Sequence, residues 1–423
     1  MGGGLAGVSA ALLLRRRGFG VICIGPTPKP DYSLGESLDF AAPALFAELG
    51  FDDDALVGDN NATWKKLIKV ETRLGESFVL RPLDFFQSLF GTETRTIHVD
   101  RSKFDAALRE AAQEAGVEFV DAKVTRLDSD GDAINACVTP HGEYRARWYL
   151  DATSRARLAA RHFRIPCRQY GMPKVSIWAQ IEVVPELQGT TLRIDNRLPY
   201  LEWLWEIPIT AQRASIGLVS SSERLKAVRQ PGESTQALLA RKMREVERFA
   251  DFRESDFMTP VRACAFQNSV IERPYGSNWL AIGEAAAMVD PLTSSGASAA
   301  IRHAGMAQVI VDEALSCSKP DRRMLEKYNR CVQMLGGAFN RNIEKTVYEP
   351  LLRNSMSLFW AAFAYTIFGY FFNAIVQRLD FRSDRDLRRM RMAERAFDAW
   401  LGVWQLLGRC SQTMRGLTVK SAR

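Results

Sequence analysis

The glycine-rich loop at the start of the chain constrains its fold more than any other stretch. Gly2, Gly4 and Gly7 give the pattern G-x-G-x-x-G, and a helix-forming run follows that ends at Gly18, ahead of the apolar residues 21–24. This order of loop, helix, glycine stop and strand is typical of sites where a pyrophosphate lies on a helix N-terminus, because glycines let it approach the backbone. The stretch therefore predicts a Rossmann-like domain with a dinucleotide site.

Two departures from this pattern concern the residues around the loop. The strand that normally precedes it is missing, because Met1 stands where the last residue of that strand would be. We therefore expect that Met1 is an internal position of a longer natural product, or that the sequence begins at a misplaced start. The acid that usually holds a ribose hydroxyl after the second strand is replaced by Gly25.

Length, charge and cysteine usage narrow the class of protein. A chain of 423 residues with 47% apolar content can bury a large core and hold two or three structural units. Its net charge of +7 is not concentrated in one tract, which argues against a nucleic-acid partner. The seven cysteines include no C-x-x-C pair and the four histidines lack metal-ligand spacing, so we expect a cytoplasmic protein without a metal site.

The middle of the chain alternates between two kinds of pattern. Residues 97–121 read as strand, helix and strand, and two hairpin signals lead to a polar turn at Asp151. Such a turn is a usual place for the backbone to approach a cofactor, although an ordinary loop looks similar. Residues 172–219 are strand-rich and predict an inserted, mostly antiparallel sheet, followed by a polar helical segment over residues 223–249.

A lysine pair and a run of small residues are the remaining candidates. If residues 61–70 form one strand, Lys65 and Lys69 share a face, and a solvated edge is the ordinary interpretation of that face. Further on, an apolar strand leads to Gly283, and Pro291 begins a loop of small residues that opens a helix over residues 297–317. Small residues at a junction of strand, loop and helix suit a flat group lying against the backbone.

Taken together, these stretches resemble the flavin-dependent halogenases, within the single-FAD-domain flavoprotein monooxygenases. The hexapeptide at residues 203–208 matches the halogenase signature W-x-W-x-I-P through Trp203, Trp205, Ile207 and Pro208. The resemblance covers residues 1 to about 330. The residues that it assigns to cofactor binding, in the family's order, are Gly2, Gly4, Gly7, Glu36, Ser37, Arg101, Asp151, Gly283, Pro291, Ser295 and Gly296.

The resemblance implies an α/β fold with a Rossmann-like FAD-binding domain, an inserted antiparallel substrate domain and a C-terminal helical region. We expect the FAD-binding domain in two parts, residues 1–165 and 259–330. The β substrate domain with its helix then occupies residues 166–258, and residues 331–423 form an apolar cap or a membrane-associating region.

The implied chemistry is halogenation with reduced FAD, O2 and chloride or bromide. In the family the tryptophan wall keeps the organic substrate from the flavin, and hypohalous acid travels to a lysine whose place Lys65 holds. That lysine acts as a neutral amine or as a charged hydrogen-bond donor, and the sequence leaves both open. Tryptophan halogenases carry a glutamate where this chain has Thr293, which favours a phenol- or pyrrole-like ring over free tryptophan. Ser294 and the two residues after it offer donors where the family binds chloride and the flavin edge.

Partners and alternatives follow from the same resemblance. No second nucleotide loop is visible, so we expect a separate NAD(P)H-dependent flavin reductase, and a small aromatic substrate of secondary metabolism, free or bound to a carrier protein. A hydroxylase or reductase of the same fold, and a flavin-binding protein without catalysis, remain alternatives.

The C-terminal region contains two unusual stretches. Residues 354–377 carry no charge and are long enough to span a bilayer. A helix that roofs the cavity or contacts the inner face of the membrane is the preferred alternative. Residues 378–395 hold seven arginines and four acids. They predict a solvated helix, or else a docking surface for an acidic carrier protein or anionic lipid.

Overall fold

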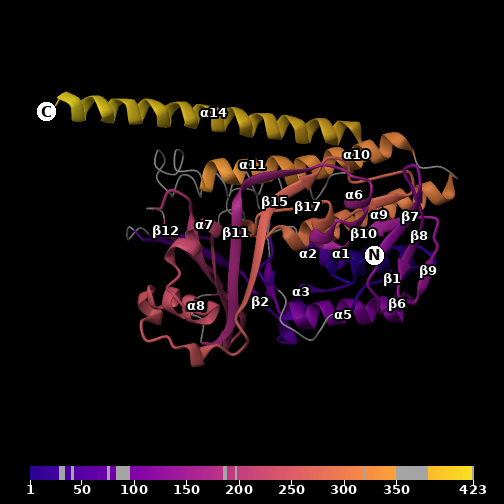
Figure 1. The fold of residues 1–423 in the computed structure, drawn as a ribbon, viewed down its shortest axis with the longest axis horizontal. Helices are drawn as coiled ribbons and strands as arrows, with labels where there is room; N and C mark the ends of the chain where they lie inside the picture. The colour runs from indigo at the N-terminus through magenta and orange to yellow at the C-terminus, as the bar shows by residue number, and fades with distance from the viewer. Residues whose placement is uncertain are drawn as a thin grey trace.

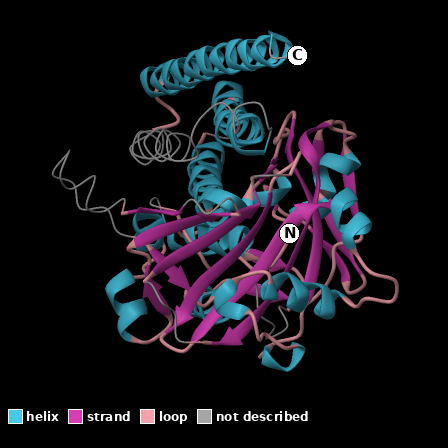
Figure 2. Ribbon diagram, turned by 90° about the vertical axis from the view of Figure 1, so that its left-hand side faces the viewer, coloured by secondary structure: helices cyan, strands magenta, loops and turns pink. Residues whose placement is uncertain are grey.

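A large sheet and a smaller parallel unit lie side by side, with the C-terminal helices stacked above them in the computed structural model (Figures 1 and 2). The structure describes residues 1–27, 34–39, 42–73, 77–81, 96–183, 188–195, 198–317, 321–348 and 380–421. The predicted α/β class is confirmed.

The parallel unit contains the glycine loop and its helix, α1 (Leu5–Arg16). Strand β1 pairs in parallel with β6, and β10 pairs in parallel with β16. Helix α5 begins at an Asp100 cap, whose carboxylate accepts the Ser102 N–H at 3.1 Å. The elements of this unit are β1 (Ile22–Ile24), α2 (Ala42–Glu48), α3 (Asp53–Gly58), β2 (Ala62–Trp64), β5 (Ile97–Val99), α5 (Arg101–Glu114), β6 (Glu118–Val120), β10 (Tyr149–Asp151), α6 (Leu158–His162), β16 (Trp279–Ala281) and α9 (Gly296–Ser316).

The two parallel strand pairs are joined through Met1. Its N-terminal amine donates to the Leu150 carbonyl at 2.9 Å, and its carbonyl accepts the Ala152 N–H at 2.8 Å. On the other side, the Gly2 N–H donates to Ile24 at 2.7 Å. Beyond these contacts lies a cavity of about 590 Å³ whose lining includes residues 22–24 of β1, residues 149 and 150 of β10, and the charged residues Arg15, Glu118, Arg145 and Arg147.

The large sheet has eight strands and extends beyond the range that the sequence predicted. Its order is β17-β15-β11-β14-β13-β12-β3-β4, so strands from before and after residues 166–258 belong to it. Residues 223–249 form two helices and a short turn instead of one helix. The elements are β3 (Leu67–Thr72), β4 (Ser77–Leu80), β11 (Cys167–Glu182), β12 (Gly189–Asp195), β13 (Glu202–Thr210), β14 (Arg213–Ser221), α7 (Ser222–Val228), α8 (Thr235–Arg244), β15 (Arg262–Ile271) and β17 (Ala287–Met288).

Two hairpins form the predicted antiparallel ribbon. Strands β7 (Arg126–Asp130), β8 (Ala133–Thr139) and β9 (Gly142–Tyr144) pair in sequence order, and turns at Gly131 and Gly142 connect them. Both glycines have positive φ, which this kind of turn requires. The ribbon therefore follows directly from local turn chemistry.

The C-terminal helices cover the large sheet. Helix α10 (Arg322–Val332) continues through a π-helical stretch into α11 (Phe339–Ile343) and a second π-helical stretch, Glu344–Tyr348. Helix α14 (Asp384–Ser421) lies above them and extends past the body of the molecule (Figure 1). Residues 354–377, for which the sequence offered a membrane span, lie outside the described residues. No helix within the described ranges is long and apolar enough to cross a membrane.

Candidate active site

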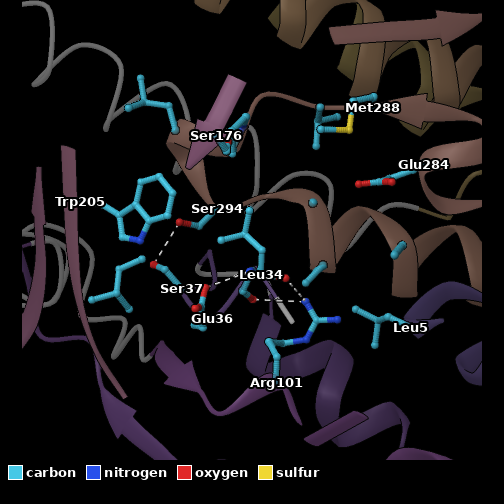
Figure 3. A pocket seen from close by; sticks show the side chains of 18 of the residues that line it. Leu5, Leu34, Glu36, Ser37, Arg101, Ser176, Trp205, Glu284, Met288 and Ser294 are labelled. Atoms are coloured by element: carbon cyan, nitrogen blue, oxygen red, sulfur yellow. Dashed lines mark hydrogen bonds between the residues drawn. The ribbon is translucent and has the colours of Figure 1, made fainter. Parts of the chain in front are cut away.

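A cavity of about 350 Å³ lies between the glycine loop and the large sheet (Figure 3). Its walls come from distant parts of the chain, which include the glycine loop, the segment around residue 36, Arg101, Ala152 and Ser154, strands of the large sheet, and several residues between 282 and 300. Ten residues that the sequence singled out line it: Gly4, Glu36, Ser37, Arg101, Trp203, Trp205, Ile207, Pro291, Ser294 and Gly296. The fold thus gathers most of the predicted site around one space.

A second cavity of about 780 Å³ lies on the other side of the glycine loop. Gly4, Leu5, Ala152 and Ser154 line both cavities, so the loop stands between them. A Cβ added at Gly4 would meet nothing within 4 Å, which leaves the backbone at the start of α1 open to a ligand. The two cavities and this bare helix N-terminus fit a dinucleotide with its pyrophosphate at the loop.

The outer glycines of the loop are required by close backbone contacts. A Cβ at Gly2 would lie 2.2 Å from the Ala152 carbonyl oxygen, and one at Gly7 would lie 1.9 Å from the Gly2 oxygen. Gly2 also has a φ of +102°, which disfavours any other residue. The spacing G-x-G-x-x-G therefore reflects two packing constraints and one open position.

Five predicted cofactor residues do not line the first cavity in the described structure: Gly2, Gly7, Asp151, Gly283 and Ser295. The buried Asp151 carboxylate accepts the N–H groups of Thr153 at 2.9 Å and Ala159 at 2.7 Å, so it shapes the turn that carries Ala152. Gly283 packs against α1, since an added Cβ would lie 2.7 Å from the Ala6 Cβ. Both residues act on the site through the backbone that they position.

Arg101 and Glu36 hold the segment of residues 34–37, which lines the cavity. The Arg101 guanidinium donates to the Leu34 carbonyl at 3.1 Å (Figure 3). It also pairs with Asp105 at 3.0 Å. The buried Glu36 carboxylate accepts the Gly35 N–H at 2.9 Å. These contacts fix the position of the neighbouring Ser37.

The tryptophan pair forms one wall of the cavity from strand β13. Trp203, Trp205 and Ile207 all face the cavity, as alternation along a strand requires. The ring planes of the two tryptophans are tilted by 48° with centroids 5.7 Å apart, so the wall is not flat. The Trp205 indole donates to Ser215 at 3.1 Å. Both rings are buried, so the wall also belongs to the core.

Lys65 is buried behind Ser37 and does not itself line the cavity in the described structure, and its burial is contrary to the solvated-edge interpretation. Strand β2 ends at Trp64 and β3 begins at Leu67, so the lysine lies in a break between two strands. Its Nζ donates to Ser37 Oγ at 2.9 Å and to the Leu38 carbonyl at 3.0 Å. Burial lowers the pKa of Lys65 to about 8, and the nearby Asp39 carboxylate opposes this in part.

Lys69 lies away from Lys65, whereas one residue of the small-residue loop, Ser294, contacts Ser37 in the cavity wall. Lys69 lies on β3 and pairs with Glu71, and it does not share a strand face with Lys65. In the loop, Ser294 has a φ of +61° and donates its hydroxyl to Ser37 at 3.0 Å (Figure 3). Thr293 and Ser295 pair with each other at 3.2 Å and do not line the cavity in the described structure.

A buried ionic cluster behind the wall was not predicted from the sequence. The Lys174 ammonium is fully buried, lies 3.1 Å from the Asp290 carboxylate and also pairs with Glu344. Tyr348 donates to Asp290 at 3.2 Å and accepts the Trp203 indole N–H at 3.0 Å. Because its members come from three distant segments, no spacing in the sequence could have indicated this support for the wall.

Comparison with known proteins decides the family. A family model described as tryptophan halogenase matches residues 76–367, more than half of the chain. The chain belongs to the tryptophan halogenase family.

Individual relatives agree with this assignment. A tryptophan 2-halogenase from Chondromyces crocatus is 28% identical over 376 residues, which cover 86% of this chain and 69% of the relative. A 1H-pyrrole-2-carbonyl-(peptidyl-carrier protein) brominase from Pseudoalteromonas luteoviolacea (strain 2ta16) is 24% identical over 327 residues, with 74% and 77% covered. Among solved structures, the flavin-dependent brominase Bmp2 matches with a TM-score of 0.68 at 20% identity, covering 99% of this chain and 98% of that one.

The family assignment confirms the predicted class of enzyme. The protein is a flavin-dependent halogenase, an FAD-dependent oxidoreductase that uses FAD, a halide and O2. The two cavities on either side of Gly4 fit this cofactor. Gly2 and Gly7 allow the loop to pack closely against its neighbouring backbone, which leaves Gly4 open to the cofactor.

Proposed function

We propose that this enzyme halogenates an electron-rich aromatic ring, phenol- or pyrrole-like and not free tryptophan, through hypohalous acid delivered by Lys65. The observation that carries the proposal is the hydrogen bond from Lys65 Nζ to Ser37, a residue of the cavity wall, at 2.9 Å. Bound FAD supplies the O2-dependent oxidation of halide. The residues of the chain then have to guide the oxidant and exclude the ring from the flavin.

The arrangement of side chains supports a separation of these two tasks. Trp203 and Trp205 line the cavity beside Gly4 and Arg101, where a bulky aromatic substrate would compete with their rings for space. Ser37 and Ser294 carry hydroxyl groups from the same cavity toward Lys65. A small oxidant can follow these hydroxyls, whereas an aromatic ring cannot pass the wall.

The choice of ring rests on Thr293 and on the relatives. The threonine offers no carboxylate to assist attack on a less reactive ring, so a phenol or pyrrole is the better match. Two relatives are described as halogenases of a pyrrole held on a peptidyl-carrier protein. The similarity to a tryptophan 2-halogenase makes an indole the alternative substrate.

Two partners belong to the proposal. A separate NAD(P)H-dependent flavin reductase supplies reduced FAD. An acidic carrier protein presents the ring and docks on helix α14. Four exposed arginines at helical spacing on this helix would attract an acidic surface: Arg385, Arg388, Arg391 and Arg395.

The test supplies the enzyme with reduced FAD, O2 and chloride or bromide, and offers phenols, pyrroles and indoles, free and carrier-bound. We expect halogenated phenol or pyrrole from the native enzyme and none from Lys65→Ala, which still oxidises flavin. Halogenation of tryptophan in preference to these rings would overturn the substrate assignment. Hydroxylated products without halide would instead support a hydroxylase.

A further inference from the structure

A buried histidine is connected to Lys65 by a chain of hydroxyl groups. His98 on β5 is fully buried, and its Nε2 lies 2.9 Å from the Thr190 hydroxyl. Thr190 lies 3.2 Å from the Ser37 hydroxyl, which accepts a hydrogen bond from Lys65 at 2.9 Å. Four side chains from four separate segments thus form one continuous hydrogen-bonded path.

The contacts on the far side of the imidazole give this path a direction. Thr63 Oγ1 donates to the Pro208 carbonyl at 2.9 Å, so at 3.3 Å from His98 Nδ1 it acts as an acceptor. Nδ1 therefore carries the proton of the neutral ring, and Nε2 accepts from Thr190. Thr190 in turn accepts from Ser37, and every hydroxyl proton on the path points from Lys65 toward His98.

We propose that Ser37 and Thr190 relay a proton from Lys65 to His98 and so leave Lys65 as the neutral amine that accepts the halogen. This inference rests on the proposed function and chooses one of the two states that the sequence left open. His98 is a positioning residue in this scheme, because it acts through Thr190 and does not line the cavity in the described structure.

The step balances in protons and electrons. The Lys65 ammonium gives a proton to Ser37, Ser37 gives its own to Thr190, and Thr190 gives its own to His98 Nε2. The free amine then attacks the halogen of hypohalous acid, an N–halogen bond forms, the O–halogen bond breaks, and water leaves with one amine proton. The ring carbon takes the halogen as the N–halogen bond breaks, and the ring proton returns to nitrogen. The halogen arrives already oxidised, so no further oxidant is needed.

The charges around the path favour one shared positive charge. Burial lowers the pKa of His98 well below its ordinary value, and the positive charge of Lys65 lowers it further. The second effect disappears as Lys65 gives up its proton, so the two sites titrate as a coupled pair. Asp39 is the carboxylate that acts on Lys65, and the Arg302 guanidinium acts on Asp39 from helix α9.

The relay also supplies a proton acceptor in place of the carboxylate that is missing at Thr293. Where tryptophan halogenases have a glutamate, Thr293 hydrogen-bonds to Ser295 and does not reach Lys65. A neutral imidazole at the end of the hydroxyl path supplies a proton acceptor from a different part of the fold. Its distance from residue 293 in the sequence explains why no local pattern reveals it.

Two matched substitutions test the relay, Thr190→Val within the path and Thr191→Val at the neighbouring buried threonine of β12, which lies outside the path. With Thr190→Val we expect the halogenation rate at pH 7 to fall about tenfold or more. The rate should recover as the pH rises past the Lys65 pKa of about 8, because bulk base then removes the proton. Thr191→Val should keep the native pH profile, and Thr190→Ser should restore it. FAD affinity and melting temperature serve as controls for folding.

A titration without turnover provides the second readout. In histidine-labelled protein, nitrogen NMR should show His98 as the neutral Nδ1–H form, and Lys65→Met should raise its pKa. Equal pH profiles for the two valine variants, or a His98 pKa unaffected by Lys65→Met, would overturn the relay. If the native enzyme halogenates nothing, the proposed function fails, while the titration still decides whether the two groups are coupled.

Discussion

Replacing Lys65 with methionine should abolish halogenation and at the same time stabilise the folded protein at neutral pH. The side chain is buried, with 5% of its surface exposed, and its pKa falls from 10.5 to about 8. This difference corresponds to about 3 kcal/mol by which folding disfavours the charged lysine. Methionine has a similar length and no charge, so Lys65→Met removes this cost while it removes the amine that the proposal requires.

The stability gain should depend on pH in a defined direction. Below pH 8 the lysine is charged in both the folded and the unfolded chain, and the full cost of about 3 kcal/mol is present. Between pH 8 and 10.5 the folded protein loses this proton first, so the native protein becomes more stable as the pH rises. The variant lacks this rise. Its advantage in free energy of unfolding should therefore shrink over this interval.

Urea unfolding at several pH values between 7 and 10, followed by tryptophan fluorescence, measures this difference. Lys66→Met is the matched control, because Lys66 is the adjacent lysine and is exposed. We expect no comparable gain from the control. A constant difference between native protein and Lys65→Met across the whole pH range would refute the argument from burial. Halogenation retained in Lys65→Met or Lys65→Arg would refute the assigned role.

Three further changes test other parts of the molecule. Because Trp203 and Trp205 are buried, replacing both with alanine should unfold the protein, at about 3–5 kcal/mol each. Phenylalanine at either position should keep the fold and raise release of free hypohalous acid, measured with a dye that reacts with hypohalous acid; an unchanged release would contradict the role of the wall. A valine-rich extension of about five residues ahead of Met1 should pair between β1 and β10, because a strand there satisfies backbone groups worth about 1–3 kcal/mol each. Melting temperature and FAD occupancy should then rise together, and no rise in either would show that the cavity between β1 and β10 does not accept a strand. Glutamate at the four exposed arginines of α14 should weaken turnover of a carrier-bound ring and spare the free ring, whereas equal effects on both would exclude docking there.

Several features of the protein could be predicted because they depend on neighbouring residues. Gly2, Gly4 and Gly7 lie close together in the chain, and their spacing together with the helix and strand that follow indicates a dinucleotide site. Alternation along a strand likewise predicts that Trp203 and Trp205 share a face. The Asp100 cap and the hairpins also follow from local backbone chemistry.

Tertiary structure decided what surrounds these features. The sequence by itself favours a solvated edge for Lys65, yet a break between β2 and β3 buries it beside Ser37, almost thirty residues away. His98 and Thr190 are linked to it through Ser37 from two further strands, and Lys174 meets Asp290 behind the wall across 116 residues of sequence. Hydrophobic patterning determines which faces are buried, but it does not specify which polar groups meet there. Partners that satisfy a buried charge are selected by packing between remote segments, and this step appears only in the folded chain.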